Sequence, residues 1–257
     1  MRILGLIGGM SWYGSLHYYK MINEGARQRL GVRNSAPIIM HCLDYEDLYT
    51  PFDDAAWART EARIVPVARA LEAAGAEGLV MCSNALHRVA AAIERAVQIP
   101  LIHVVDAVEE AIDAAGVRRP VLIGNRHVLD AGFYVARLSR RPGTTVLLPS
   151  PEDRTRIHDA IRDEVSAGII DPVSRRAIVG MVQRLVEMEG ADSVIFGCTE
   201  IRALLSAEDM PVPVFDSMTL HVDAALAFAS RPVSPSGETS GPFPDSAPDR
   251  LPSSPAP

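Results

Sequence analysis

Short apolar runs alternate with longer amphipathic segments along most of the chain, which is the pattern of a parallel α/β protein. The first run, 2–7, leads into Gly8-Gly9 and then a helical segment that Ser11 is placed to cap, ending near residue 29. Further strands are expected at 37–43, 78–81, 101–104, 120–124, 145–148, 194–196 and 212–215. Further helices are expected at 56–74, 86–96, 107–115, 129–138, 152–166, 172–189 and 219–229.

Two stretches of this pattern look like copies of one another. Residues 75–84 and 190–199 each contain a Gly-Ala-acid turn, a buried strand and then small polar or thiol side chains. Aligned without a gap, they place Ser83 opposite Cys198 and Cys82 opposite Gly197. The chain therefore predicts two tandem α/β halves. Because ligands of parallel sheets lie at the strand carboxyl ends, we expect the site in a cleft between the halves.

Composition narrows the class of protein. The 257 residues suffice for one large or two small domains, and the formal charge of −7 argues against a nucleic-acid partner. No apolar run reaches the roughly 18 residues of a membrane span. Three cysteines without a CxxC pair suit a reducing cytoplasm, and the histidines lack the HExxH spacing of a metal site. Residues 230–257 are rich in Pro and Ser and are expected to form a disordered tail.

The ends of the two matching strands carry the candidate chemistry. Cys198 ends a buried strand just before a helix, where backbone N–H groups and the helix dipole favour a thiolate. A polar partner, Ser83 or Cys82, ends the matching strand of the other half. Two facing proton-transfer groups suit stereochemical inversion, in which a base removes a proton from one face of a carbon and an acid returns one to the other. Asn84 and Thr199 are placed to hold an α-carboxylate.

At these residues the chain resembles a known family, the cofactor-independent aspartate/glutamate racemases. The resemblance rests on 8–12, Tyr18-Tyr19, 22–25, 152–154, 213–216 and the second cysteine motif 197–201, and it covers about residues 1–229. It implies two similar flavodoxin-like lobes with an active site in the cleft between them, no pyridoxal phosphate or other cofactor, and a homodimer. On this basis the first lobe comprises 1–103 with 213–229, and the second comprises 104–212.

The first cysteine motif departs from the family pattern of Cys-Asn-Thr, one further residue, and His. Matching Asn84 and His87 to that pattern puts Ser83 at the cysteine position, as the internal repeat does, so we favour Ser83 over Cys82 as the partner of Cys198. Ala85 replaces the motif threonine. Around the substrate the resemblance places eight residues: Met10, Phe52, Asn84, Ala85, Asn125, Arg156, Thr199 and Glu200.

Several of these positions allow two interpretations. Phe52 stands where relatives often carry a polar or basic group, which favours a side chain less acidic than aspartate, although aspartate or glutamate stays open. Arg156 supplies a cation to the substrate or is a solvated charge. Glu200 either caps its helix, which we favour, or polarises the site. His87 either assists proton transfer or fixes the helix start. Cys42, Trp12 and Trp57 are expected to be packing residues.

Two other kinds of function are compatible with the altered first motif. One is another enzyme on the same scaffold, such as a decarboxylase, a cis–trans isomerase of a dicarboxylate or a hydantoin racemase. Another, from a different class, is a catalytically silent protein that binds a small molecule in the cleft. Glu200 after Cys198, together with the opening motif, favours the amino-acid racemases.

Overall fold

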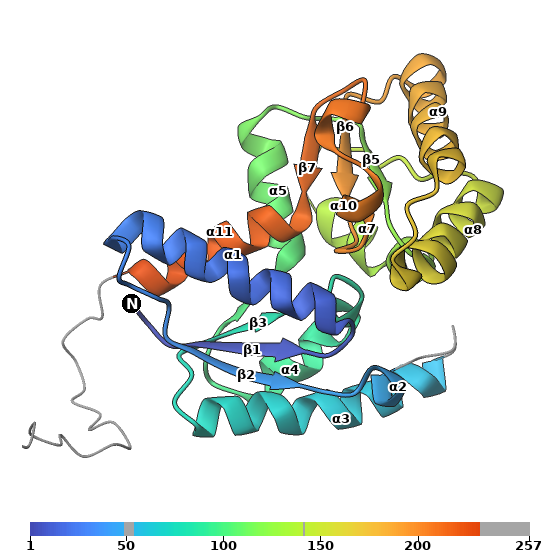
Figure 1. Cartoon of the computed structure of the whole chain (residues 1–257). Helices are drawn as coiled ribbons and strands as arrows, with labels where there is room; N and C mark the ends of the chain where they lie inside the picture. The colour runs from blue at the N-terminus through green and yellow to red at the C-terminus, as the bar shows by residue number, and fades with distance from the viewer. Residues whose placement is uncertain (49–53, 141, 232–257) are drawn as a thin grey trace, which may run out of the picture.

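The computed structural model describes residues 1–48, 54–140 and 142–231, which form two parallel β-sheets flanked by helices (Figure 1). The first sheet has the order β2-β1-β3-β4 and consists of β1 (Leu4–Gly8), β2 (Ile38–Cys42), β3 (Gly78–Met81) and β4 (Leu101–Ile102). The second has the order β5-β6-β7 and consists of β5 (Pro120–Ile123), β6 (Ser193–Phe196) and β7 (Val214–Asp216). The predicted two-lobed α/β class is confirmed, since all described strand pairs are parallel.

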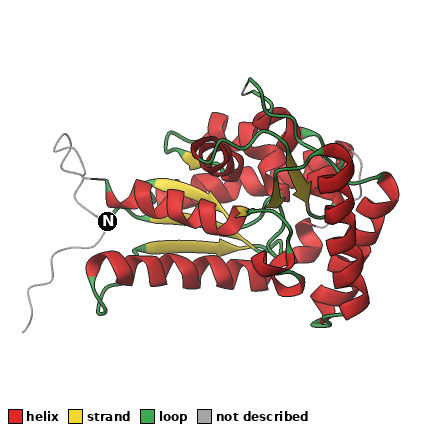
Figure 2. Cartoon of the chain, turned by 90° about the horizontal axis from the view of Figure 1, so that it is seen from above, coloured by secondary structure: helices red, strands yellow, loops and turns green. Residues whose placement is uncertain are grey.

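Helices cover both faces of the first sheet, as the view from above shows (Figure 2). The helices of the chain up to β4 are α1 (Trp12–Leu30), α2 (Tyr45–Leu48), α3 (Asp54–Ala73), the 3₁₀ turn η1 (Ala85–Val89) and α4 (Ala90–Ala96). Those after β4 are α5 (Val104–Ala114), α6 (Arg126–Leu129), α7 (Phe133–Leu138), α8 (Pro151–Asp159), α9 (Pro172–Glu189), α10 (Ile201–Leu204) and α11 (Ser217–Ser230). After α8 the chain continues as the π-helical turn η2 (Ala160–Glu164) and the 3₁₀ turn η3 (Val165–Ala167), and η4 (Ala207–Asp209) follows α10.

Local sequence signals explain where the long helices begin and end. The Ser11 hydroxyl accepts a hydrogen bond from Gly14 N and caps α1, as predicted. The Asp171 carboxylate accepts from Val173 N, and Pro172 occupies the first turn of α9, where its missing N–H costs nothing. Gly190 ends α9 in the left-handed region, at a φ of 64°, which a side chain would disfavour.

The internal repeat has a physical counterpart in the hydrogen bonds of the two Gly-Ala-acid turns. The Glu77 carboxylate accepts from Ile3 N at 2.8 Å, and the Asp192 carboxylate accepts from Arg118 N at 2.7 Å, both across 74 positions. Cys82 N donates to Ile7 O and Gly197 N donates to Ile123 O, each at 2.8 Å. Cys82 and Gly197 are therefore equivalent in the two sheets, and the next residues, Ser83 and Cys198, are equivalent as well.

The last strand and helix of the described chain lie in different lobes, which corrects the expectation that 213–229 as a whole joins the first lobe. β7 pairs with β6 in the second sheet. α11 then packs against the first lobe, where its Met218, Val222 and Leu226 join a buried cluster with Leu4 and Tyr18. β7 lies in the second sheet because β6 offers it an open edge for pairing. α11 lies against the first lobe because its apolar face packs there.

Two further expectations are corrected. The helix expected at 129–138 is divided into α6 and α7, because Gly132 adopts a left-handed φ of 70°. Residues 145–148 form a single parallel bridge, Val121 to Leu147, rather than a strand. A single glycine within a helical pattern does not by itself reveal a break in the helix. A single bridge is likewise too short to be distinguished from a strand in the sequence.

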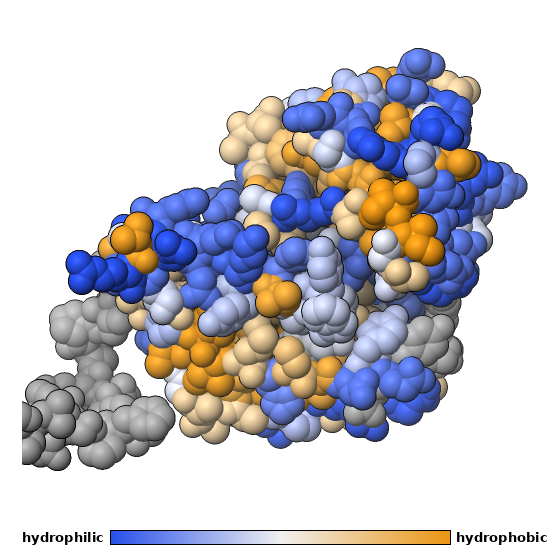
Figure 3. All heavy atoms as spheres, viewed as in Figure 1, coloured by the Kyte–Doolittle hydropathy of each residue, from blue (hydrophilic) through white to orange (hydrophobic). Residues whose placement is uncertain are grey.

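Two presumed packing residues lie at the surface. Cys42 is exposed because it is the last residue of β2, the outer strand of its sheet, and Trp12 is 74% exposed at the start of α1. Trp57, by contrast, is buried as expected. On the face shown in Figure 3 apolar groups appear in separate patches within a largely hydrophilic surface.

Phe52 and the tail from 232 onward lie outside the described residues. In the described part of the chain, every helix is too short or too polar to cross a bilayer.

Candidate active site

A cavity of about 730 Å³ lies between the two sheets, at the carboxyl ends of β3 and β6. The first lobe contributes the ends of β1 and β3, the start of α1 and α2, and the second lobe contributes the ends of β5 and β6 with α6, α8 and η2. Of the residues expected at the site, nine line the described cavity: Met10, Cys82, Ser83, Asn84, Ala85, Asn125, Cys198, Thr199 and Glu200. The cleft expected from the repeat is thus present, and both strand ends open into it.

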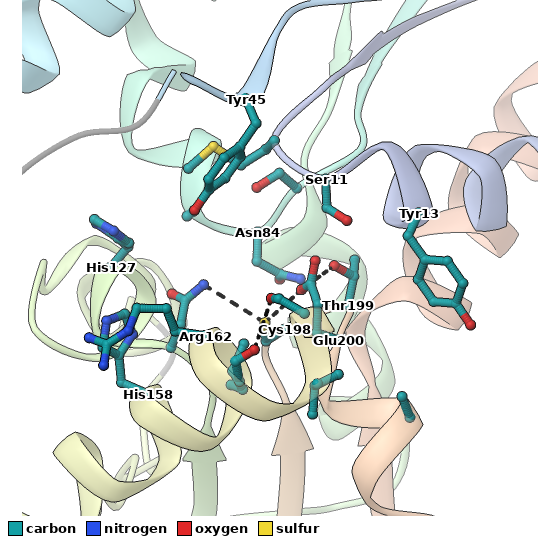
Figure 4. A pocket seen from close by; sticks show the side chains of 18 of the residues that line it. Ser11, Tyr13, Tyr45, Asn84, His127, His158, Arg162, Cys198, Thr199 and Glu200 are labelled. Carbon is teal, nitrogen blue, oxygen red and sulfur yellow. Dashed lines mark hydrogen bonds between the residues drawn. The ribbon is translucent and has the colours of Figure 1, made fainter. Parts of the chain in front are cut away.

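Cys198 lies at the centre of this cavity, next to the carboxylate of Glu200 (Figure 4). The thiol donates a hydrogen bond to Glu200 Oε2 at 3.0 Å, and the Thr199 hydroxyl donates to the same oxygen at 2.6 Å. The Asn125 side chain, whose carbonyl caps α6, approaches the sulfur at 3.8 Å. Glu200 therefore faces the thiol instead of capping α10, for which its side chain makes no cap hydrogen bond.

The surroundings of Cys198 favour the neutral thiol rather than the thiolate expected from the sequence. Burial, followed by the charge of Glu200 and the hydrogen bond to it, raises the pKa of Cys198 well above its usual range. α10 is only four residues long, so its dipole offers little to offset a carboxylate at 3.0 Å. In the resting site Cys198 is a proton donor with an adjacent proton acceptor.

Ser83 occupies the equivalent position at the end of β3, and its backbone is held by His87. His87 Nε2 accepts a hydrogen bond from Val104 N at 3.2 Å, so the ring proton is on Nδ1, which donates to Ser83 O at 2.8 Å. Burial and the neighbouring His103 and His221 lower the pKa of His87 well below its usual range. His87 is neutral and fixes the turn after β3, so of its two expected roles the structural one fits.

Cys82 contributes differently from Ser83, although both line the cavity. Side chains alternate along β3, and Cys82 follows Val80 into the buried cluster with Tyr18, whereas Met81 belongs to the opposite face. Burial raises the pKa of Cys82 far above its usual range. The Cys82 thiol therefore packs among the apolar side chains of this cluster.

Asn84 and Thr199 both lie close to Cys198 in the cavity (Figure 4). Asn84 is 2% exposed, and its Nδ2 donates to Ser217 Oγ at 3.0 Å. Its Oδ1 is buried without a hydrogen-bond partner among the described residues. Thr199 comes close to the first lobe, since a Cβ on Gly14 of α1 would lie 3.1 Å from its hydroxyl. The two lobes are therefore in near contact beside the candidate catalytic groups.

Arg156 does not line the described cavity, which corrects its assignment to the substrate. It is exposed on α8, and the residues two and six positions later, His158 and Arg162, face the cavity instead. Two positions along a helix turn the side chain by about 200°, which explains the difference. The i, i+4 spacing of His158 and Arg162 in the predicted helix was the signal that could have identified them.

His127, His158 and Arg162 gather on one wall of the cavity, away from Thr199 and Glu200 (Figure 4). Burial lowers the pKa of His127 to about 4, and burial together with Arg162 lowers the pKa of His158. Arg162 forms ion pairs with Asp159 at 3.0 Å and with Asp163. Among the described lining residues, the one full positive charge is thus already paired with carboxylates. Ile161, Val165 and Ile170 make the neighbouring surface apolar.

Comparison with known proteins relates this geometry to one family. A sequence model of the Asp/Glu/Hydantoin racemase family matches residues 7–225. The structure is similar to that of a proposed Asp/Glu racemase from Yersinia pestis, with 38% identity, a TM-score of 0.84, and coverage of 90% of this chain and 100% of that one. It is also similar to an aspartate racemase homologue from Pyrococcus horikoshii OT3, with 29% identity, a TM-score of 0.79 and the same coverage. A variant of arylmalonate decarboxylase shares the fold at 19% identity and a TM-score of 0.56, over 90% of this chain and 93% of that one.

Proposed function

Because this chain belongs to the Asp/Glu/hydantoin racemase family, we propose that it is a cofactor-independent amino-acid racemase with Ser83 and Cys198 as its acid and base. The observation that carries the proposal is the equivalence of these two residues. Each follows the same ladder hydrogen bond in its own sheet, and each opens into the cavity between the sheets. Pseudo-symmetric groups of this kind reach opposite faces of one bound carbon.

The proposed reaction is a proton exchange at the α-carbon. Asn84, Thr199 and the backbone N–H groups that follow the two strands hold the α-carboxylate, and donors there stabilise the carbanion. The Cys198 thiol first passes its proton to Glu200, and the resulting thiolate removes the α-proton from one face. Ser83 then donates its hydroxyl proton to the opposite face, and solvent exchange restores both groups. Side chains alone carry these steps.

The two directions of the reaction are expected to differ in rate. Cys198 has the Glu200 carboxylate as a proton acceptor, whereas the position equivalent to Glu200 in the first half is Ala85. A serine hydroxyl is a much weaker acid than a thiol. To act as the base, Ser83 must lose its proton, and Ala85 cannot accept it as Glu200 accepts that of Cys198. Turnover that begins with proton removal by Cys198 is therefore expected to have the higher kcat.

For the substrate, we propose an amino acid whose side chain is less acidic than that of aspartate. His127 and His158 are neutral at neutral pH, and Arg162 is paired with two carboxylates. This wall offers hydrogen-bond donors and apolar area, but little net charge to compensate a second carboxylate. A cavity of about 730 Å³ also leaves room for a side chain longer than that of aspartate.

The proposal is tested by incubating the protein in D₂O with single enantiomers of amino acids, without pyridoxal phosphate. Racemisation predicts loss of optical rotation together with deuterium at the α-carbon, observed by NMR. A decarboxylase, the second candidate because arylmalonate decarboxylase shares the fold, would instead release carbon dioxide from a disubstituted malonate. Binding without either reaction would show a silent binding protein.

Two properties stay predictions from the sequence. A homodimer would sediment at about twice the chain mass of 27.8 kDa. A cytoplasmic location is predicted from the cysteine content, and the three cysteines, Cys42, Cys82 and Cys198, are free thiols in the structure.

A further inference from the structure

The junction between β7 and α11 joins the two lobes and contacts Asn84, a residue that lines the cavity. On one side of it, β7 is held in the second sheet, with Phe196 opposite Asp216. On the other side, α11 is anchored to the first lobe along its length. His221 on α11 contacts the Tyr18 hydroxyl at 2.9 Å and Ile102 O at 2.7 Å, and Ala229 O accepts from Arg2 N at 2.8 Å. The junction is therefore a fixed link between the sheets (Figure 1).

The first residue of α11, Ser217, contacts the motif at the end of β3. Its hydroxyl accepts the hydrogen bond from Asn84 Nδ2 at 3.0 Å, across 133 positions of sequence. Both side chains are almost fully buried, at 1% and 2% exposure, so water does not compete for this bond. Asn84 follows Ser83 directly, and Ser217 thereby fixes the turn that presents the Ser83 hydroxyl.

The preceding residue, Asp216, contacts the segment that follows Cys198. Arg202 lies four positions after Cys198 on α10, and its guanidinium pairs with Asp216 Oδ2 at 2.9 Å. It also donates to the Thr219 hydroxyl at 3.3 Å, and Thr219 in turn donates to Asp216. The other oxygen of Asp216 accepts from Met218 N at 3.0 Å and caps α11. Asp216 therefore acts both as a helix cap and as a contact between the β7–α11 junction and α10.

We propose that Ser217 is a positioning residue, which with the Asp216–Arg202 pair holds the Ser83 and Cys198 turns at one fixed separation. This inference rests on the proposed racemase function, because two-face proton transfer depends on the distance between its two groups. A displacement of about 1 Å at a reacting group costs about 10²-fold in rate. Removal of the Ser217 hydroxyl deprives Asn84 Nδ2 of this hydrogen bond and lets the amide rotate. The removal is therefore expected to lower turnover more than stability.

The test compares Ser217→Ala with Ser193→Ala. Ser193 is also fully buried, but it begins β6 at the opposite end of the strand from Cys198. After α-deuterium exchange by the wild-type protein has been established, kcat, KM and the melting temperature are measured for both variants. Ser217→Ala is expected to lose about tenfold or more in kcat, with a smaller change in KM and a melting temperature similar to that of Ser193→Ala. Ser193→Ala is expected to keep kcat within twofold.

A second variant, Arg202→Gln, keeps the inference testable if Ser217→Ala folds poorly, because the Arg202 side chain is 38% exposed and its loss leaves no buried gap. It is expected to lower kcat by about threefold or more. Wild-type kcat in the variants that fold would overturn the positioning role, while leaving the racemase assignment intact. Absence of deuterium exchange in the wild-type protein would instead contradict the assignment itself.

Discussion

The carboxylate of Glu200 accepts a hydrogen bond from the thiol of Cys198 at 3.0 Å inside the cavity, where the thiol is buried and the carboxylate is partly buried. The same oxygen also binds the Thr199 hydroxyl. This contact distinguishes the second half of the chain from the first, in which Ala85 takes the equivalent place. It favours the protonated thiol at rest and offers the acceptor that the proposed deprotonation of Cys198 requires.

Replacing Glu200 with Gln separates these two effects. The amide keeps the hydrogen bond but removes the charge, so the raised pKa of Cys198 is expected to fall towards its usual range. Alkylation of Cys198 by iodoacetamide, followed by peptide mass spectrometry, should then reach half its maximal rate at a lower pH. Racemisation should nevertheless decrease by about 10²-fold or more, because the proton acceptor is lost.

Glu208→Gln is the matched control, since Glu208 is exposed on η4. It should leave both the alkylation profile and the racemisation rate unchanged. An alkylation profile in Glu200→Gln that stays in place or moves to higher pH would show that the thiol is not coupled to Glu200. Peptide-level detection is needed because Cys42 is exposed and also reacts.

Buried neutral histidines predict a loss of stability in mild acid. Burial lowers the pKa of His221 to about 4 and that of His103 to about 3, whereas both titrate near 6.5 in the unfolded chain. Below pH 6.5 the unfolded state binds more protons than the folded state, so this stability is present above pH 6.5 and is lost as the pH falls towards 4. Each such histidine contributes a slope of about 1.4 kcal/mol per pH unit.

Urea unfolding of His221→Gln between pH 6.5 and 4 measures this contribution. Glutamine offers a donor and an acceptor for Ile102 O and the Tyr18 hydroxyl without titrating, so the pH slope should decrease by about 1.4 kcal/mol per unit. Ser193→Ala, which truncates a buried side chain without removing a titratable group, should leave the slope unchanged. Equal slopes for wild type and His221→Gln would contradict the assignment of a neutral His221.

The pairing of Arg162 with Asp159 and Asp163 predicts substrate preference. Wild-type kcat/KM should be higher for neutral amino acids, such as glutamine and methionine, than for aspartate. Asp159→Asn combined with Asp163→Asn releases the guanidinium from its carboxylate partners. The preference should then shift towards aspartate by about threefold or more, as expected for one partly exposed charge. Faster turnover of aspartate than of neutral amino acids by the wild-type protein would refute the proposed substrate class.

The parts of the fold that depend on local signals were predictable from the sequence. Ser11 and Asp171 cap helices where the sequence places caps, and the Gly-Ala-acid turns bind equivalent N–H groups in the two halves. Few residue types form caps and turns of this kind, so the sequence identifies them directly. The register that aligns Ser83 with Cys198 follows from these turns, and the ladder hydrogen bonds agree with it.

Features that depend on contacts between distant segments were not predictable in the same way. The position of β7 depends on an open edge at β6, and the face that α8 presents depends on how the helix rotates against the second sheet. Helix rotation explains why Arg162 rather than Arg156 reaches the cavity. Likewise, no local pattern reveals that Glu200 binds the thiol beside it, because a carboxylate next to a helix start equally suits a cap.

The proposed proton exchange depends most directly on which residue is the partner of Cys198. The decisive measurement is α-deuterium incorporation and loss of optical rotation in D₂O for Ser83→Ala, Cys198→Ala and Cys82→Ala, all with the best substrate of the wild-type protein. We predict that the Ser83 and Cys198 variants each lose inversion, by about 10²-fold or more, while Cys82→Ala retains most of it because its thiol packs in the core. Near-normal inversion by Ser83→Ala, with loss of inversion in Cys82→Ala, would contradict the account and make Cys82 the second catalytic residue.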